Sequence, residues 1–164
     1  MTTISQAPAA SSDQAVWGRV LTLHAQVERQ LTQALQRRHG IGLSEFRALE
    51  CLVQAKDGEL RMQELADKVG LGQSSVTRLV GRLFSAGFAV RDVCPDDKRG
   101  VYAVIVDAGR QRYAEARGTY SEVLSAALNT AGATPELGST VQALRGAVWP
   151  SSAAAAFTVW SPSA

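Results

Sequence analysis

Between Gly72 and Phe88 the chain reads GQSSVTRLVGRLFSAGF, and its polar residue types are those that contact nucleic acid. Gln can pair with adenine through two hydrogen bonds, Ser bonds to several base edges, and the Thr methyl group contacts the thymine methyl. Arg binds guanine or a backbone phosphate. The spacing predicts a helix whose apolar face is formed by Val76, Leu79, Val80 and Leu83. The candidate contacts on its polar face are Gln73, Ser74, Ser75, Thr77, Arg78 and Arg82.

An ordinary solvated helix face has a similar composition, so these residue types alone do not decide between the two interpretations. Three features favour DNA. No carboxylate occurs between Gly72 and Val90, and the polar residues gather at the start of the helix, which is the end that meets base edges in a major groove. A hairpin with a basic tip follows directly, so we predict that this helix contacts double-stranded DNA.

The hairpin is predicted from two β-rich runs, Phe88–Val93 and Val101–Val106, joined by the turn-rich loop CPDDKRG. Arg99 in this loop is expected to enter a minor groove or to clamp a phosphate. Lys98 and Arg61 are expected to contact phosphates. The alternative is a polar turn in which Arg99 pairs with a neighbouring carboxylate.

The elements that must position these residues occur in the order of a winged helix-turn-helix. A helix is predicted from about Ser44, followed by a very short strand at Leu60–Met62 and a helix over Gln63–Val69. The glycine-rich corner Gly70–Gly72 then leads into the polar helix. Packing of the short helix across the polar helix would hold the polar face outward.

A long amphipathic helix is predicted before this unit, from a capping box at Ser11 and Gln14 to a stop at His39–Gly40. Its apolar seam needs to be covered, and a partner chain is the natural candidate. After the hairpin, Asp107 is predicted to cap a helix that runs to about Ala131. Thr134, Pro135 and Glu136 are predicted to begin a last helix.

The predicted fold is mainly α with a small β-wing. It combines a winged helix-turn-helix domain, residues 43–106, with dimerisation helices in residues 13–40 and 107–148. Residues 1–12 are expected to be a flexible N-terminus, and residues 149–164 a low-complexity tail.

The run from Leu60 to Gly109 resembles the DNA-binding core of the multiple-antibiotic-resistance-regulator (MarR) family. The resemblance extends roughly from Trp17 to Leu144, and its motifs are Leu65-Ala66, the Ser-x-Val-Thr-Arg-Leu-Val run, Arg82-Leu83 before an Ala-Gly turn, and Asp97-Lys98-Arg99. It implies a triangular homodimer with interlocking terminal helices. It also implies binding to pseudo-palindromic operators, usually as a repressor released by a small ligand or by oxidation, with Asp97 orienting Arg99.

The chain departs from the family pattern at three positions. Gly81 replaces the usual Asp in the middle of the polar helix, where Gly lowers helix stability by about 1 kcal/mol relative to Ala. Gly72 stands where Ser or Thr often caps that helix, and Asp107 must replace a Thr cap after the wing. The Gly81 change is expected to weaken or redirect DNA binding.

The family resemblance places a ligand pocket where the dimerisation helices meet the DNA-binding lobe. Trp17, His24, Arg47 and Tyr120 are candidates for it, because an aromatic wall, a titratable ring and a cation suit an anionic phenolic compound. The alternative is that Trp17 and His24 belong to the dimer seam and that Arg47 is a surface residue. Neither Cys51, in an apolar setting, nor Cys94, beside acidic residues, has the basic surroundings that activate a thiolate.

Composition limits the remaining classes of function. The 164 residues carry a net charge of +2, which permits a polyanionic partner without requiring one. The sequence has no phosphate-binding Gly-rich loop, metal-ligand spacing or His beside a nucleophile, so we expect no enzyme and no cofactor. The lack of a secretory signal favours the cytoplasm. The main alternative to a DNA-binding regulator is a winged-helix module that binds protein.

Overall fold

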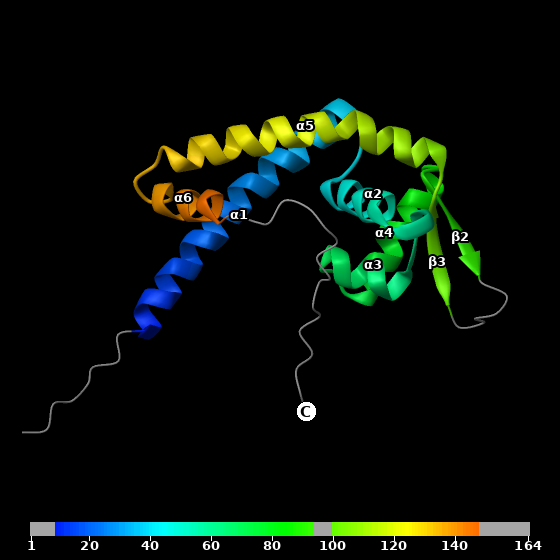
Figure 1. Ribbon diagram of the computed structural model, residues 1–164, viewed down its shortest axis with the longest axis horizontal. Helices are drawn as coiled ribbons and strands as arrows, with labels where there is room; N and C mark the ends of the chain where they lie inside the picture. Colours follow the sequence, from blue (N-terminus) through cyan, green and yellow to red (C-terminus); the bar gives the residue numbers. More distant parts are fainter. Residues whose placement is uncertain (1–8, 94–99, 148–164) are drawn as a thin grey trace, which may run out of the picture.

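The computed structural model describes residues 9–93 and 100–147, and they form a mainly helical fold with one small sheet (Figure 1). This confirms the predicted fold class. The helices are α1 (Ala9–His39), α2 (Leu43–Gln54), the short 3₁₀ helix η1 (Lys56–Gly58), α3 (Met62–Val69), α4 (Gln73–Ser85), α5 (Asp107–Gly132) and α6 (Gly138–Gly146). The strands are β1 (Glu59–Arg61), β2 (Ala89–Val93) and β3 (Val101–Ile105).

Helix α2 lies at the centre of the main core. Phe46, Leu49 and Leu52 on α2 are completely buried, and the apolar faces of α3 and α4 pack in the same cluster. On the opposite side, α5 contributes Tyr113 and Ala116 to this cluster. The core therefore fixes α4 from behind and leaves its other face to solvent.

The corner between α3 and α4 depends on a glycine in the left-handed region. Gly70 has φ 72°, and the Leu71 N–H beyond it donates to the Ala66 carbonyl at 3.0 Å. Gly72 then begins α4, since its carbonyl accepts the Ser75 and Val76 N–H groups, both at 3.0 Å. As predicted, no side chain caps this end of α4.

The wing is a three-stranded antiparallel sheet in the order β1-β3-β2. The predicted hairpin of β2 and β3 is confirmed, and its register places Arg91 opposite Ala103. β1 adds a third strand on the other side of β3, with Arg61 opposite Tyr102. Because β1 leads directly into α3, its pairing with β3 connects the start of α3 to the wing.

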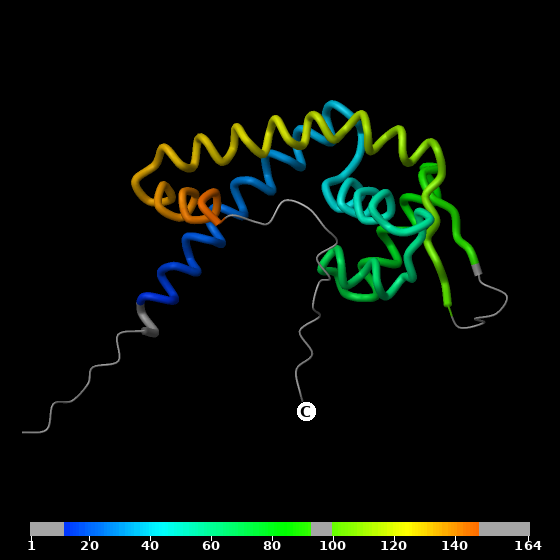
Figure 2. Tube along the Cα trace, viewed as in Figure 1, coloured from blue at the N-terminus to red at the C-terminus, as the bar shows by residue number. Residues whose placement is uncertain are grey.

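Helices α1 and α5 pack against each other on the side of the molecule away from α3 (Figures 1 and 2). A second, smaller cluster joins the middle of α1 and the far end of α5 to α6 through Leu23, Ala131, Leu137 and Val141. The first turns of α1 extend beyond α6 (Figure 2). No helix in the described residues is both long and apolar enough to cross a membrane.

Three predicted helix starts are wrong. Helix α1 begins at Ala9, so Ser11 lies inside its first turn and not at its cap. Val106 is the N-cap residue of α5, and Asp107 is the first helical residue, where its carboxylate still favours the positive helix end. Helix α6 begins only at Gly138, because Thr134 closes a turn in which its hydroxyl oxygen accepts the Leu137 N–H at 3.3 Å.

Candidate nucleic-acid interface

Helix α4 has one buried and one exposed face. Val76, Leu79, Val80 and Leu83 are at most 1% exposed. The residues at the start of its other face are all exposed, and they are Gln73, Ser74, Ser75, Thr77 and Arg78. The first turn of α4 is therefore a solvent-facing polar surface without a carboxylate, as the sequence predicts.

The two arginines of α4 differ in their partners. The Arg82 side chain is 56% exposed, but its Nε donates to the Glu45 carboxylate at 2.7 Å. The other oxygen of Glu45 accepts the Gly42 N–H at 2.8 Å, so Arg82 ties α4 to the start of α2. A guanidinium has five N–H donors, so this bond leaves others for a phosphate. Within the described residues, Arg78 has no ion pair or side-chain hydrogen bond.

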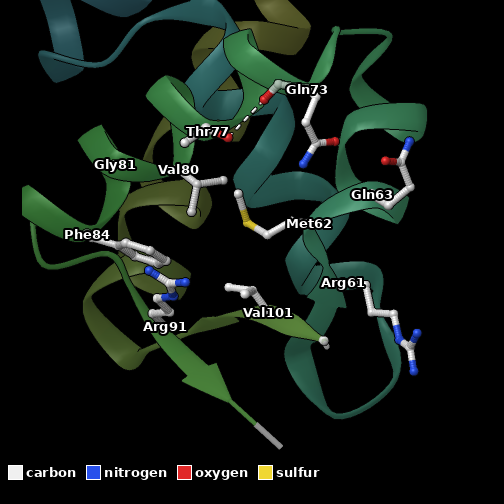
Figure 3. A pocket seen from close by; sticks show the side chains of 11 residues that line it. Arg61, Met62, Gln63, Gln73, Thr77, Val80, Gly81, Phe84, Arg91 and Val101 are labelled. Atoms are coloured by element: carbon white, nitrogen blue, oxygen red, sulfur yellow. Dashed lines mark hydrogen bonds between the residues drawn. The ribbon is translucent and has the colours of Figure 1, made fainter. Parts of the chain in front are cut away.

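Arg61 lies at the end of β1, which is an edge strand of the wing. Its Nε donates to the Tyr102 hydroxyl at 2.7 Å, and its guanidinium lies 5.4 Å from the centre of the Tyr102 ring. Figure 3 shows this side chain directed away from α4. The predicted wing-tip residues Asp97, Lys98 and Arg99 lie outside the described residues, so their roles stay predictions.

A groove of about 470 Å³ separates α4 from the wing (Figure 3). Met62, Val80, Phe84 and Val101 give it an apolar floor. The other lining residues are Arg61, Gln63, Gln73, Thr77, Gly81, Arg91 and Gly100. Two of these are arginines and none of the described lining residues is acidic, so the groove favours an anion.

Arg91 is a groove residue that the sequence interpretation missed. It lies two residues after Ala89 on β2, so both side chains point to the same face of the sheet. Ala89 is buried in the core, whereas Arg91 is exposed and reaches the groove beside Phe84 (Figure 3). The alternation of buried and exposed residues on β2 is a signal that the sequence contains, but the predicted basic contacts of the wing were limited to its loop and Arg61.

The structure brings two of the four predicted pocket residues together. Glu28 of α1 bonds to Arg47 of α2 at 2.5 Å through the same oxygen that lies 3.4 Å from His24 Nε2. Trp17 lies about two turns before His24 on α1 and is 61% exposed. His24 and Arg47 thus share a carboxylate at the junction of α1 with the winged-helix lobe.

Tyr120, the fourth predicted pocket residue, belongs to the core. Its ring stacks on Phe46 with 4.6 Å between the ring centres. The groove beside α4 is lined by none of the four residues. Their role in binding a ligand remains a prediction.

Cys51 is half-buried on α2. Burial raises the pKa of the Cys51 thiol, and nearby Lys68 opposes this only in part. A raised pKa keeps the thiol protonated at neutral pH, which disfavours oxidation by a thiolate route. Cys94 lies outside the described residues.

Comparisons with known proteins agree with this arrangement. Residues 41–101 match the model of the MarR family. An uncharacterized HTH-type transcriptional regulator of Bacillus subtilis, YkoM, is 35% identical over 75 residues, which are 46% of this chain and 47% of YkoM. The HTH-type transcriptional regulator MhqR of the same organism is 32% identical over 72 residues, 44% of this chain and 48% of MhqR. The chain thus aligns with about half the length of these curated relatives.

A solved structure matches over nearly the whole length of both chains. It is Sco3205 from Streptomyces coelicolor, a MarR family transcriptional regulator in complex with DNA. The two folds superpose with a TM-score of 0.70 at 25% sequence identity, over 88% of this chain and 89% of Sco3205. This chain is therefore similar to MarR family regulators, over residues 41–101 in its sequence and over most of its length in its fold.

Proposed function

We propose that this protein is a homodimeric transcriptional regulator that reads DNA with α4 and has no catalytic role. The observation that carries the proposal is the face of α4, which exposes polar side chains from Gln73 to Arg78 opposite a fully buried apolar face. The crystal structure of the similar Sco3205 in complex with DNA supports the same use of the fold. We also propose a cytoplasmic location for this role on DNA.

The dimensions of α4 suit a major groove. A helix with its side chains is about 10–12 Å across, and the major groove of B-DNA is about 12 Å wide. In this position Gln73, Ser74, Ser75, Thr77 and Arg78 would face base edges. Arg82 and Arg61 would meet phosphates, while Lys98 and Arg99, oriented by Asp97, would contact the backbone or a flanking minor groove.

A second copy of the chain would cover the apolar surface near the ends of α1 and α6. Large apolar residues are exposed there, with Val16 at 50%, Trp17 at 61%, Leu21 at 50% and Leu144 at 57%. A two-fold dimer presents two copies of α4, so its operator is an inverted repeat with half-sites about 10–10.5 bp apart or multiples of that spacing.

The regulatory part of the proposal is repression that a small anionic or phenolic ligand relieves. The shared contact of His24 and Arg47 with Glu28 supports this site, because it joins a dimerisation helix to the lobe that carries α4. A ligand that competes for Arg47 would change this joint. Trp17 and Tyr120 are the proposed aromatic contacts.

The test is selection of bound duplexes from a random DNA library at moderate salt, with the wild type and Arg78→Ala. We expect the wild type to enrich an inverted repeat, and Arg78→Ala to bind it about tenfold or more weakly. Arg117→Gln is the matched control, because Arg117 is an exposed arginine on α5, on the other side of α2 from α3 (Figure 1).

Enrichment of no sequence pattern would contradict this function. A protein-binding winged helix would then be favoured, because Gly81 lies exposed in the middle of α4 and the net charge is only +2. Protein docking depends much less on salt than binding to phosphates does. Salt titration of whatever complex forms separates the two functions.

A further inference from the structure

The arginines around the groove beside α4 differ in whether they already have a partner. Arg82, just outside the groove, is bonded to Glu45, and Arg61 is bonded to Tyr102. The Arg91 side chain has no hydrogen bond, ion pair or ring contact with any residue that the structure describes. Its guanidinium is exposed, so its five N–H donors are open to a partner from outside.

Gly81 keeps the side of the groove opposite Arg91 open. It lies on the stripe of α4 that also carries Gln73 and Thr77, each four residues from the next, and all three line the groove. A Cβ built at Gly81 would meet no atom within 4 Å. No side chain at this position therefore fills the groove or neutralises Arg91.

A DNA strand must pass along this side of α4 if the helix enters a major groove. The helix is nearly as wide as the groove, so the sugar-phosphate backbones lie along both of its flanks. The stripe of Gln73, Thr77 and Gly81 forms one such flank, and Arg91 faces it from β2 (Figure 3). Phosphates on that flank would meet Arg91 across Gly81, which has no side chain.

We propose that Arg91 binds a backbone phosphate of the DNA, and that the absence of a side chain at Gly81 admits this phosphate to the groove. The inference rests on the proposed function and adds a contact outside both α4 and the wing tip. It assigns the groove a positioning role, because phosphate contacts set register and affinity without reading sequence.

The test measures the salt dependence of binding to the selected duplex and to a scrambled duplex. Each phosphate contact contributes about one unit to the slope of log K against log salt. We expect Arg91→Gln to lower that slope by about 1 and to weaken binding to both duplexes by a similar factor, about tenfold at low salt. Arg91→Lys should keep most of the slope, because a point charge still binds phosphate.

Two further variants sharpen the test. Arg117→Gln removes the same charge from α5 and should leave the slope unchanged. Gly81→Asp should weaken binding more in the wild type than in the Arg91→Gln background, because only the wild type has an arginine for the new carboxylate to pair with. Asp is the usual family residue here, so this outcome would reverse the expectation that Gly81 itself weakens DNA binding. Matching thermal unfolding of all variants would show that the fold is kept.

The outcomes separate this inference from the proposed function. If the wild type binds its selected duplex and Arg91→Gln keeps the wild-type slope, Arg91 is not a phosphate contact and the DNA-binding function stands. If Arg91→Gln alters the preferred sequence without changing the slope, Arg91 reads bases and the inference is wrong. If the wild type binds no duplex, both fail together.

Discussion

The arginines of the candidate interface are distinguished by the bonds they already make. Arg82 shares the Glu45 carboxylate with a backbone N–H, so it supports the joint between α2 and α4 as well as facing solvent. Arg78 and Arg91 lack such partners among the described residues. Replacing Arg82 would therefore disturb both packing and binding, whereas Arg78 and Arg91 allow binding to be tested with the fold intact.

Tyr113 links stability to pH. Its hydroxyl donates to the Glu50 carboxylate at 3.1 Å, and burial, with help from Glu50, raises the pKa of Tyr113. The unfolded chain loses this proton near pH 10, before the folded chain does, so the free energy of unfolding falls as the pH rises above about 10. Tyr113→Phe removes this titration.

We expect Tyr113→Phe to be less stable than the wild type by about 1 kcal/mol at pH 8, where the hydrogen bond to Glu50 is present. The difference should shrink as the pH rises above about 10, since only the wild type loses stability through this group. Urea unfolding at a series of pH values measures both terms. Parallel curves for the two proteins above about pH 10 would show that Tyr113 does not titrate differently in the folded state.

At the scale of elements, two helical glycines should respond in opposite ways to the same substitution. A Cβ at Gly81 on α4 meets open space, so Gly81→Ala should raise the free energy of unfolding by about 0.5–1 kcal/mol. A Cβ at Gly109 on α5 would lie 2.1 Å from the Phe88 carbonyl oxygen, so Gly109→Ala should destabilise the protein by more than that amount. Equal effects of the two substitutions in urea unfolding would contradict this account.

The sequence predicted the elements whose signals are local. The period of apolar residues located the α-helices, and Gly40, with φ 65°, ends α1 as expected. The short strand β1 was predicted, but its place in the wing was missed, because β1 pairs with β3, about 40 residues later, and no local pattern specifies that partner. The start of α6 was missed because Thr134 and Pro135 also suit the turn that forms there.

Like the fold, the candidate site was predictable where its signals are local. The exposed face of α4 follows from its 3.6-residue period, and the burial of Val76, Leu79 and Val80 agrees with it. The ion pair of Arg82 with Glu45 joins residues 37 positions apart, so only the folded chain shows that Arg82 is occupied. The open space at Gly81, opposite Arg91, is likewise visible only when β2 and α4 are placed side by side.

At the scale of the whole molecule, the exposed apolar residues of α1 and α6 predict self-association. We expect the protein to have twice its 17.4 kDa chain mass in solution. Trp17→Glu combined with Leu21→Glu should shift it to the single-chain mass, because two charges would replace exposed apolar surface at the seam. Sedimentation equilibrium measures both masses.

Gln30→Glu is a control for that experiment, since Gln30 is exposed on the same helix and is not apolar. It should leave the mass of the dimer unchanged. A wild type of single-chain mass at micromolar concentration would remove the basis for a two-fold operator, even if the chain still bound DNA.

Helix α5 spans the molecule without interruption over 26 residues, which makes it about 39 Å long. One end is fixed to the wing, where the Phe88 carbonyl accepts the Val106 N–H at 3.2 Å and leaves no room for a Cβ on Gly109. The other end packs on Leu137 and Val141 beside the proposed dimer seam. The length of the helix therefore fixes the distance between the wing and the proposed seam. One inserted residue would advance its far end by about 1.5 Å and rotate it by about 100°. The spacing of half-sites that the proposed dimer would accept is thus set by the residue count of α5.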